Sequence, residues 1–291
     1  MIVEPVGHEE LRRLMQEVYG SAMSAAEFEW WFDRNPAGPR ILTGARDADG
    51  SLLGVLAMSP ARTSSGPAAF AIHAVTTPAA RGRGVFSTLE LDNEEQARAA
   101  GAAWALGFTN PLAGPILVGK LGWEDVTSLR IWVRPKRLRR RATGALRAEP
   151  HCPPFTHGRE QDSSTHHIVK DTRYLDWRYA DSPRPYLRLD GRDGGWVVVR
   201  YADWHGFSSA VVCDASGRHV SELLRRSVAA VDADLGVAIV NPGEERAYFA
   251  AGFLPSPRSI RFIGKRLAED APPLPKHRRS WRFSLGDLDF F

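Results

Sequence analysis

Apolar residues in the first half of the chain recur in two spacings, one typical of helices and the other of strands. Leu11, Leu14 and Val18 recur every three or four residues and predict an amphipathic helix. The helices predicted in this way cover 8–19, 87–100 and 112–121. Short apolar runs predict strands at 40–46, 52–58, 68–76, 102–109 and 129–134. Asp49-Gly50 predicts a tight hairpin between the first two strands.

The second half of the chain repeats part of this order. Apolar runs predict strands at 196–201, 207–214 and 235–240, with a helix over 219–231. Asn241-Pro242 follows the last of these strands, and Gly252-Phe253 closes the next helix. Asn110-Pro111 and Gly122-Trp123 do the same in the first half, and the two Asn-to-Gly intervals differ by one residue. Internal similarity of this kind predicts two duplicated lobes.

The segment between the two halves has no periodic pattern. Residues 134–147 form a run of basic side chains, and residues 148–165 are rich in proline, histidine and serine. We therefore predict a first domain over 1–135, a basic and proline-rich linker over 136–165, and a second lobe with a C-terminal tail over 166–291.

Composition narrows the class of protein. The 291 residues are 43% hydrophobic and 25% charged, as in soluble globular proteins, and no apolar run reaches the length of a membrane span. The N-terminus has no apolar signal core, and the two cysteines form neither a metal spacing nor a disulfide framework. We expect a cytoplasmic protein with no metal and no membrane partner. The net charge of +4 suits either a polyanionic cofactor or a nucleic acid.

The segment 76–90 carries the strongest chemical signal. An Arg-Gly-Arg-Gly turn, Arg81 to Gly84, lies between a predicted strand and a predicted helix. Glycines allow close approach of the backbone to a ligand, and a helix N-terminus offers unpaired N–H donors with partial positive charge. This combination predicts a pyrophosphate site. The segment does not match the dinucleotide-binding fingerprint, because it has no third glycine at the required spacing. It also lacks the Gly-Lys-Ser/Thr of a Walker loop.

Pro78, the Arg-Gly-x-Gly turn, the apolar pair after it and Leu89 resemble the coenzyme A loop of the GCN5-related N-acetyltransferases. Residues 107–111 and 120–123 resemble that family's fifth strand and closing turn. The resemblance covers residues 1–135 and departs at Phe86, where the family often has Gly or Ala. It implies an α+β fold, with a central, mostly antiparallel sheet flanked by helices in each of two acetyltransferase-like lobes. The second lobe has no Arg-Gly-x-Gly turn and is expected to be degenerate.

The resemblance also implies a set of residues that contact acetyl-CoA, the co-substrate. In the resembled fold the strand before the loop splays from its neighbour, which leaves a backbone N–H around Val75–Thr76 free to polarise the thioester carbonyl. The implied contacts are Ala74, Val75, Thr76, Arg81, Gly82, Arg83, Gly84, Val85, Phe86, Ser87 and Asn110.

The catalytic acid and base are less well specified. Residues 68–77 contain no acid, so His73 is the titratable side chain on this strand, although a core role for it stays open. Thr76 is the candidate carbonyl donor. The family's usual tyrosine acid falls at Val118, and the terminal carboxylate of Phe291 is a further candidate base, because two-lobed relatives place a chain terminus in the active site.

Three aromatic and charged segments could bind the acceptor, or could simply pack. Residues 25–38 offer Trp31 and Asp33, and residues 172–189 offer Trp177 and Arg178. The tail, residues 280–291, offers Asp287 and Asp289, whose charges would attract an ammonium group.

The leading hypothesis is an acetyl-CoA-dependent N-acyltransferase that acts on the amine of a small molecule, such as an amino sugar or a natural-product intermediate, without a nucleic-acid partner. One alternative is a peptidoglycan-type, FemX-like aminoacyltransferase that uses aminoacyl-tRNA. Another is a non-catalytic coenzyme A-binding protein, which the missing tyrosine and the missing strand acid favour.

Overall fold

The computed structural model of the chain describes residues 1–135, 145–146, 149–159, 161 and 163–288. The chain forms two compact units, one of Met1–Thr127 with Arg261–Lys276 and one of Ser128–Ile260 with His277–Phe291. These bounds depart from the sequence-based ones, since residues 261–276 return to the first unit and the described part of 149–165 belongs to the second.

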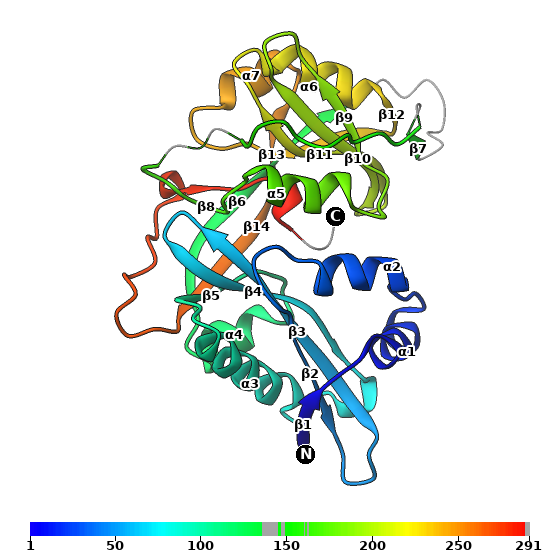
Figure 1. The fold of residues 1–291 in the computed structure, drawn as a ribbon, viewed down its shortest axis with the longest axis vertical. Helices are drawn as coiled ribbons and strands as arrows, with labels where there is room; N and C mark the ends of the chain where they lie inside the picture. The colour runs from blue at the N-terminus through cyan, green and yellow to red at the C-terminus, as the bar shows by residue number, and fades with distance from the viewer. Residues whose placement is uncertain (136–144, 147–148, 160, 162, 289–291) are drawn as a thin grey trace. The chain divides into compact units, whose positions relative to one another are not determined.

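The first unit is a sheet with helices on both faces. Along the sheet the strands are β1 (Ile2–Pro5), β2 (Ile41–Arg46), β3 (Leu52–Thr63), β4 (Gly66–Thr76), β5 (Trp104–Thr109) and the Arg261–Arg266 part of β14 (Leu254–Arg266). The helices are α1 (His8–Tyr19), α2 (Ala25–Phe28) with the π-helical turn Glu29–Asp33, α3 (Val85–Ala99) and α4 (Gly114–Lys120). Figure 1 shows α1 and α2 on one side of this sheet and α3 and α4 on the other.

The pairing of β4 with β5 explains why α3 lies where it does. These two strands are parallel, whereas the other neighbours in the first unit are antiparallel. A parallel pair needs a crossover connection, and α3 supplies it. Leu89 and Val85 of α3 pack on Leu56 and Met58 of β3, so the core on this side holds the start of α3 against the sheet.

The second unit has a related order of elements. Its sheet runs β9 (Leu187–Asp190), β10 (Trp196–Trp204), β11 (Phe207–Ser216), β13 (Leu235–Ile239) and the Ile131–Pro135 part of β6 (Glu124–Pro135). The helices are α5 (Thr172–Leu175) with the π-helical turn Asp176–Ala180, α6 (Val220–Ala229) and α7 (Glu245–Ala250). The short strands are β7 (Ala145–Leu146), β8 (His166–His167), β12 (Val231–Asp232) and β15 (Trp281–Arg282). Here too a hairpin leads into a helix, and β11 and β13 are parallel.

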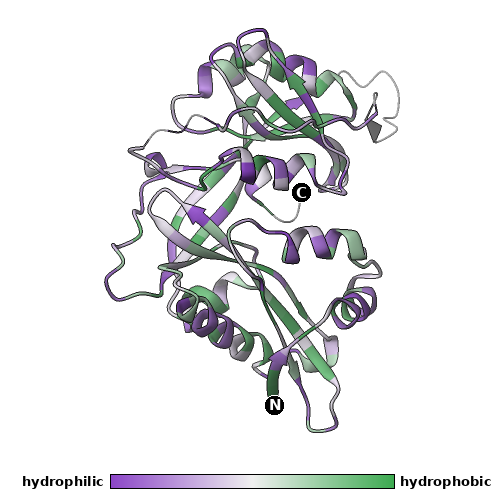
Figure 2. Ribbon diagram, in the orientation of Figure 1, coloured by the Kyte–Doolittle hydropathy of each residue, from purple (hydrophilic) through white to green (hydrophobic). Residues whose placement is uncertain are grey.

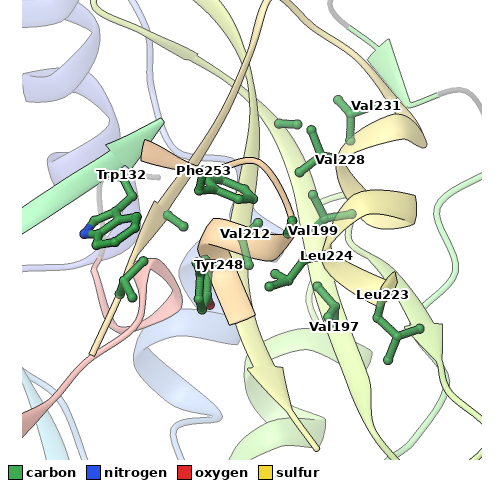
Figure 3. Packing of buried hydrophobic residues seen from close by; sticks show 14 of the residues in the cluster. Trp132, Val197, Val199, Val212, Leu223, Leu224, Val228, Val231, Tyr248 and Phe253 are labelled. Atoms are coloured by element: carbon green, nitrogen blue, oxygen red, sulfur yellow. The ribbon is translucent and has the colours of Figure 1, made fainter. Parts of the chain in front are cut away.

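One continuous cluster of apolar side chains forms the core under α6 and α7. Figure 3 shows Leu223, Leu224 and Val228 of α6 facing Val197 and Val199 of β10. Tyr248 of α7 and Phe253, which follows that helix, complete this cluster together with Trp132. In Figure 2 α6 carries both hydrophilic and hydrophobic residues, as expected of a helix with one apolar face.

None of the described helices has the length and hydrophobicity that a membrane span requires. The fold is a mixed α+β architecture with a mostly antiparallel sheet flanked by helices, as the sequence predicted. Several predicted strands are longer in the structure, and the largest differences are at β3, which continues to Thr63, and β6, which begins at Glu124. The amphipathic helix expected after residue 24 is a short helix followed by a π-helical turn.

Candidate functional site

Strand β4 contains a bulge just before its end. Val55 of β3 pairs with Val75, but Ala57 pairs with Ile72, so His73 and Ala74 together oppose one residue of β3. His73 has a φ of 45°, in the left-handed region that side chains other than glycine seldom adopt. A bulge of this kind re-aims the backbone and is common next to active sites.

Beyond this point β4 separates from β5. Parallel pairing joins Ala68–Phe70 to Trp104–Leu106, and no further described pair joins the two strands, although β4 continues to Thr76 and β5 to Thr109. We call this place the β4–β5 fork, defined by Ala71–Thr76 and Gly107–Thr109. The separation agrees with what the resemblance implied.

The hydrogen-bond register identifies which backbone donor faces the fork. The N–H of Thr77 donates to the carbonyl oxygen of Leu53 at 2.9 Å, so this pair is a hydrogen-bonded one. Bonded and non-bonded pairs alternate in an antiparallel ladder, so the next pair, Thr76 with Gly54, is non-bonded. The N–H of Thr76 therefore points away from β3, toward the side on which β5 has separated.

The loop between β4 and α3 has the backbone that an anion site needs. Gly82 and Gly84 have φ of 78° and 80°, and a Cβ added at either would meet no atom within 4 Å. Gly84 is the N-cap of α3, so the N–H groups of Val85, Phe86 and Ser87 have no partner within the helix. These donors and the open space beside them fit a phosphate or a diphosphate.

The two arginines of the loop differ. Both are exposed, but Arg83 donates to Asp47 at 2.7 Å, in the turn between β2 and β3. That contact lowers the pKa of Asp47. The charge of Arg83 is partly offset in this way, whereas no ion pair with Arg81 is found among the described residues.

Two residues that the sequence analysis did not single out also shape this site. A Cβ at Gly54 would lie 2.8 Å from the Val75 carbonyl oxygen and 2.9 Å from Cγ1 of Val85. Only glycine therefore lets β3 come this close to the end of β4 and the start of α3. The hydroxyl of Tyr19, at the end of α1, donates to the Ala74 carbonyl oxygen in the bulge at 3.2 Å. A glycine inside a strand is a recognisable signal, but Tyr19 carried none.

Of the predicted catalytic and acceptor residues in the first unit, the structure brings His73 and Trp31 together. The half-buried His73 ring lies 5.8 Å from the Phe32 ring and 6.3 Å from the Trp31 ring, between centroids. Trp31 is buried, which leaves it little surface for an acceptor. Asp33 is exposed and forms an ion pair with Arg40.

The turn after β5 is closed by a side chain that accepts hydrogen bonds from two backbone N–H groups. The side-chain oxygen of Asn110 accepts hydrogen bonds from the N–H groups of Leu112 and Ala113, both at 2.9 Å, at the entry to α4. Asn110 is exposed, so its amide NH₂ group is the part that could still contact a ligand. Val118 packs against the core of the first unit and supplies no proton.

The face of α3 that packs on the sheet is unusually polar. Asn93 accepts from Thr43 at 2.6 Å and donates to the Leu56 carbonyl oxygen at 3.0 Å. Glu94 accepts from the indole N–H of Trp123 at 2.7 Å and forms an ion pair with Lys265. Glu90 is fully buried beside them. Burial, together with the neighbouring Glu94 carboxylate, raises the pKa of Glu90 to about 8, against a weaker opposing effect of Lys265.

This pKa gives a testable dependence of stability on pH. The raised folded-state value means that the folded protein keeps a proton that the unfolded chain releases near its ordinary pKa of 4.5. Wild-type stability should therefore fall, relative to Glu90→Gln, as the pH rises toward 8, by at most about 1.4 kcal/mol per pH unit. Urea unfolding of both proteins at several pH values measures this difference. A difference that does not change with pH would contradict it.

The predicted acceptor residues of the second unit lie inside that unit. Trp177 and Arg178 are buried in the π-helical turn after α5. Arg178 donates to the carbonyl oxygens of Gly286 (2.8 Å) and Leu288 (3.4 Å), so it holds the tail. These two side chains are therefore buried, and Arg178 binds the tail of its own unit.

Asp287 takes part in a buried ionic network. Its side chain is fully buried and lies 2.8 Å from the Lys170 ammonium nitrogen. Lys170 also donates to Asp214 at 2.6 Å and to Ser284 at 2.7 Å. Burial opposes the ionisation of Asp214, but Lys170 and Arg159 hold its pKa below the usual value. The Asp287 carboxylate thus forms a buried ion pair with Lys170. The sequence had instead suggested that this carboxylate attracts the ammonium group of an acceptor. Asp289 and Phe291 lie outside the described residues.

The Asn-Pro turn of the second unit differs from that of the first. Asn241 is buried, and its side-chain oxygen accepts from the N–H of Phe283 at 2.9 Å. Its amide group donates to Glu244 at 3.1 Å. The described residues also bring no three His, Cys, Asp or Glu side chains together in a way that could hold a metal ion.

Comparisons with known proteins agree with this architecture. No family model and no curated protein matches the sequence. Among solved structures, a conserved protein from Enterococcus faecalis, described as a probable N-acyltransferase, is 13% identical with a TM-score of 0.59, over 91% of this chain and 72% of that one. A GCN5-related N-acetyltransferase from Kribbella flavida is 14% identical with a TM-score of 0.58, over 91% and 72% of the two chains. Eis1 from Mycobacterium abscessus is 14% identical with a TM-score of 0.58, over 92% and 74%. The chain therefore has the fold of the GCN5-related N-acetyltransferases.

Proposed function

We propose that this chain is an acetyl-CoA-dependent N-acyltransferase that acts on the amine of a small molecule. The observation that carries the proposal is the pair of glycines at 82 and 84, with open space at each, at the start of α3 and next to the β4–β5 fork. The solved structures with this fold support it, because two of them are N-acetyltransferases or N-acyltransferases by name.

The residues of the first unit suit the parts of acetyl-CoA. The N–H groups at the start of α3, with Arg81 and Arg83, would hold the pyrophosphate. The N–H of Thr76 would polarise the thioester carbonyl, and a donor of this kind is typically worth about 10²–10³ in rate. Bound acetyl-CoA supplies the activated acyl group.

Few side chains near the fork could transfer the protons that the reaction requires. His73 is the titratable side chain in the bulge, and its half-buried ring could take the proton of an incoming ammonium group directly or through water. The terminal carboxylate of Phe291 remains an alternative proposal. With valine at position 118, protonation of the leaving thiolate would use water or another side chain.

The second unit is proposed to bind no coenzyme of its own. The glycine at the turn before α6, Gly217, is crowded, since a Cβ there would lie 2.5 Å from Cα of Gly195. Gly82 and Gly84 face open space instead. Calorimetric titration with acetyl-CoA should therefore give one site per chain. Two equivalent sites would contradict this prediction.

Two other functions make different predictions in the same assays. An aminoacyl-tRNA-dependent transferase would bind tRNA and not acetyl-CoA. A non-catalytic coenzyme A-binding protein, favoured by the valine at 118, would bind acetyl-CoA but release no thiol with any acceptor. A panel of amines with detection of free coenzyme A thiol tests the proposal. Binding without turnover across amino sugars, amino acids and polyamines would favour the non-catalytic function.

A further inference from the structure

Glu90 stands apart from the polar side chains around it. Asn93 and Glu94, which share the same face of α3, are matched by Thr43, Leu56, Trp123 and Lys265. Neither carboxyl oxygen of Glu90 has a hydrogen-bond partner in the described structure, and the side chain is fully buried. An unmatched buried carboxyl group destabilises a fold, and an apolar side chain would be better tolerated among the neighbouring Val85 and Leu89.

The position of Glu90 along α3 relates it to both the anion-binding loop and the β4–β5 fork. It lies one helical turn before Glu94 on the same face of α3. Glu94 binds the Trp123 indole, whose ring lies 3.5 Å from the position of a Cβ on Gly107. Gly107 is the β5 residue directly after Leu106, the last residue of β5 that pairs with β4. Six residues separate Glu90 from Gly84, or about 9 Å along the helix. Along α3, Glu90 thus lies between Gly84 of the anion-binding loop and Glu94, whose partner Trp123 lies next to Gly107 of the fork.

An acyl-CoA with its diphosphate at the loop and its thioester at the fork, as proposed above, would span this interval. Its thioester and its diphosphate are joined by an arm with two amide groups, each of which carries an N–H donor and a carbonyl acceptor. A neutral carboxyl group also carries one donor and one acceptor, so it can match an amide. Burial beside Glu94 favours this neutral form at ordinary pH.

We propose that Glu90 is a binding residue for the acyl donor, and that its carboxyl group hydrogen-bonds an amide of the arm between the diphosphate and the thioester. This inference rests on the proposed function, because it requires an acyl-CoA in the loop. It accounts for an otherwise unmatched polar group in the core of the first unit.

The test compares two ligands on four proteins. The ligands are acetyl-CoA and adenosine 3′-phosphate 5′-diphosphate, which keeps the diphosphate but has no amide arm, and the proteins are wild type, Glu90→Leu, Glu90→Gln and Glu95→Leu. Glu95 lies on the exposed side of α3 and controls for loss of a charge. Glu90→Leu should bind acetyl-CoA at least about tenfold more weakly, bind the armless nucleotide like wild type, and unfold at a higher temperature. Glu90→Gln keeps a donor and an acceptor, so its affinity for acetyl-CoA should stay within about threefold of wild type.

Three outcomes would overturn the inference. Wild-type affinity of Glu90→Leu for acetyl-CoA would show that the carboxyl group makes no contact with the arm. An equal loss for both ligands would show that the substitution disturbs the loop. Lack of acetyl-CoA binding by the wild-type protein would remove the proposed function itself, and is recognised before any variant is measured.

Discussion

Replacing Gly84 by glutamate is expected to weaken acetyl-CoA binding at least about 100-fold, or about 2.7 kcal/mol, while the fold is retained. The new side chain would project from the N-cap of α3 into the open space beside the loop, where nothing lies within 4 Å of the Cβ. Its carboxylate would repel the diphosphate and compete for the helix N–H donors. Calorimetry with acetyl-CoA measures the loss.

Gly101 offers a matched control at the other end of α3. It has a φ of 86° and, like Gly84, open space around an added Cβ. Glutamate at either position costs about 1–2 kcal/mol of backbone strain, so the two variants should lose similar stability. Gly101→Glu should bind acetyl-CoA like wild type. Equal affinities of the two variants would show that this loop holds no phosphate.

Replacing Asp287 by alanine is expected to destabilise the second unit by about 3–5 kcal/mol. The change removes one of the two carboxylates that lie within ion-pair distance of Lys170 and leaves its buried ammonium group with Asp214 and Ser284. It also removes the acceptor of the Ser284 N–H, at 2.7 Å, which closes the turn before the tail. Urea unfolding monitored by tryptophan fluorescence measures the effect.

Asp190 provides the control for this prediction. It forms an ion pair with Arg188 at 3.0 Å in the same unit, but more than half of its side chain is exposed. Such exposed pairs contribute about 0–1 kcal/mol, so Asp190→Ala should change stability little. If Asp287→Ala were no more destabilising than Asp190→Ala, the buried network would not hold the tail.

The same network determines which truncation is informative about Phe291. Deletion of residues 286–291 would remove Asp287 and the Gly286 carbonyl that Arg178 binds, and would disturb the core of the second unit. A deletion confined to 289–291 spares these contacts. Only the shorter deletion can separate a chemical role of the terminal carboxylate from a packing role of the tail.

The sequence by itself determined the features that depend on neighbours along the chain. The helix over 8–19, the strand before the loop, the Arg81–Gly84 turn and the start of α3 were all predictable, because spacing of apolar residues and left-handed glycines act locally. The resemblance carried by this turn led to the fold.

Tertiary structure decided the features that depend on pairing between distant segments. The bulge at His73 arises from the register of β4 against β3, and the return of residues 261–276 to the first unit begins with the pairing of Arg261–Arg266 with β5. The commitment of Asp287 to Lys170 joins residues more than a hundred positions apart, and the burial of Glu90 depends on which face of α3 meets the sheet. From the sequence alone, a charged side chain is expected to be exposed. Only the packing of the chain shows where burial shifts the pKa of such a side chain.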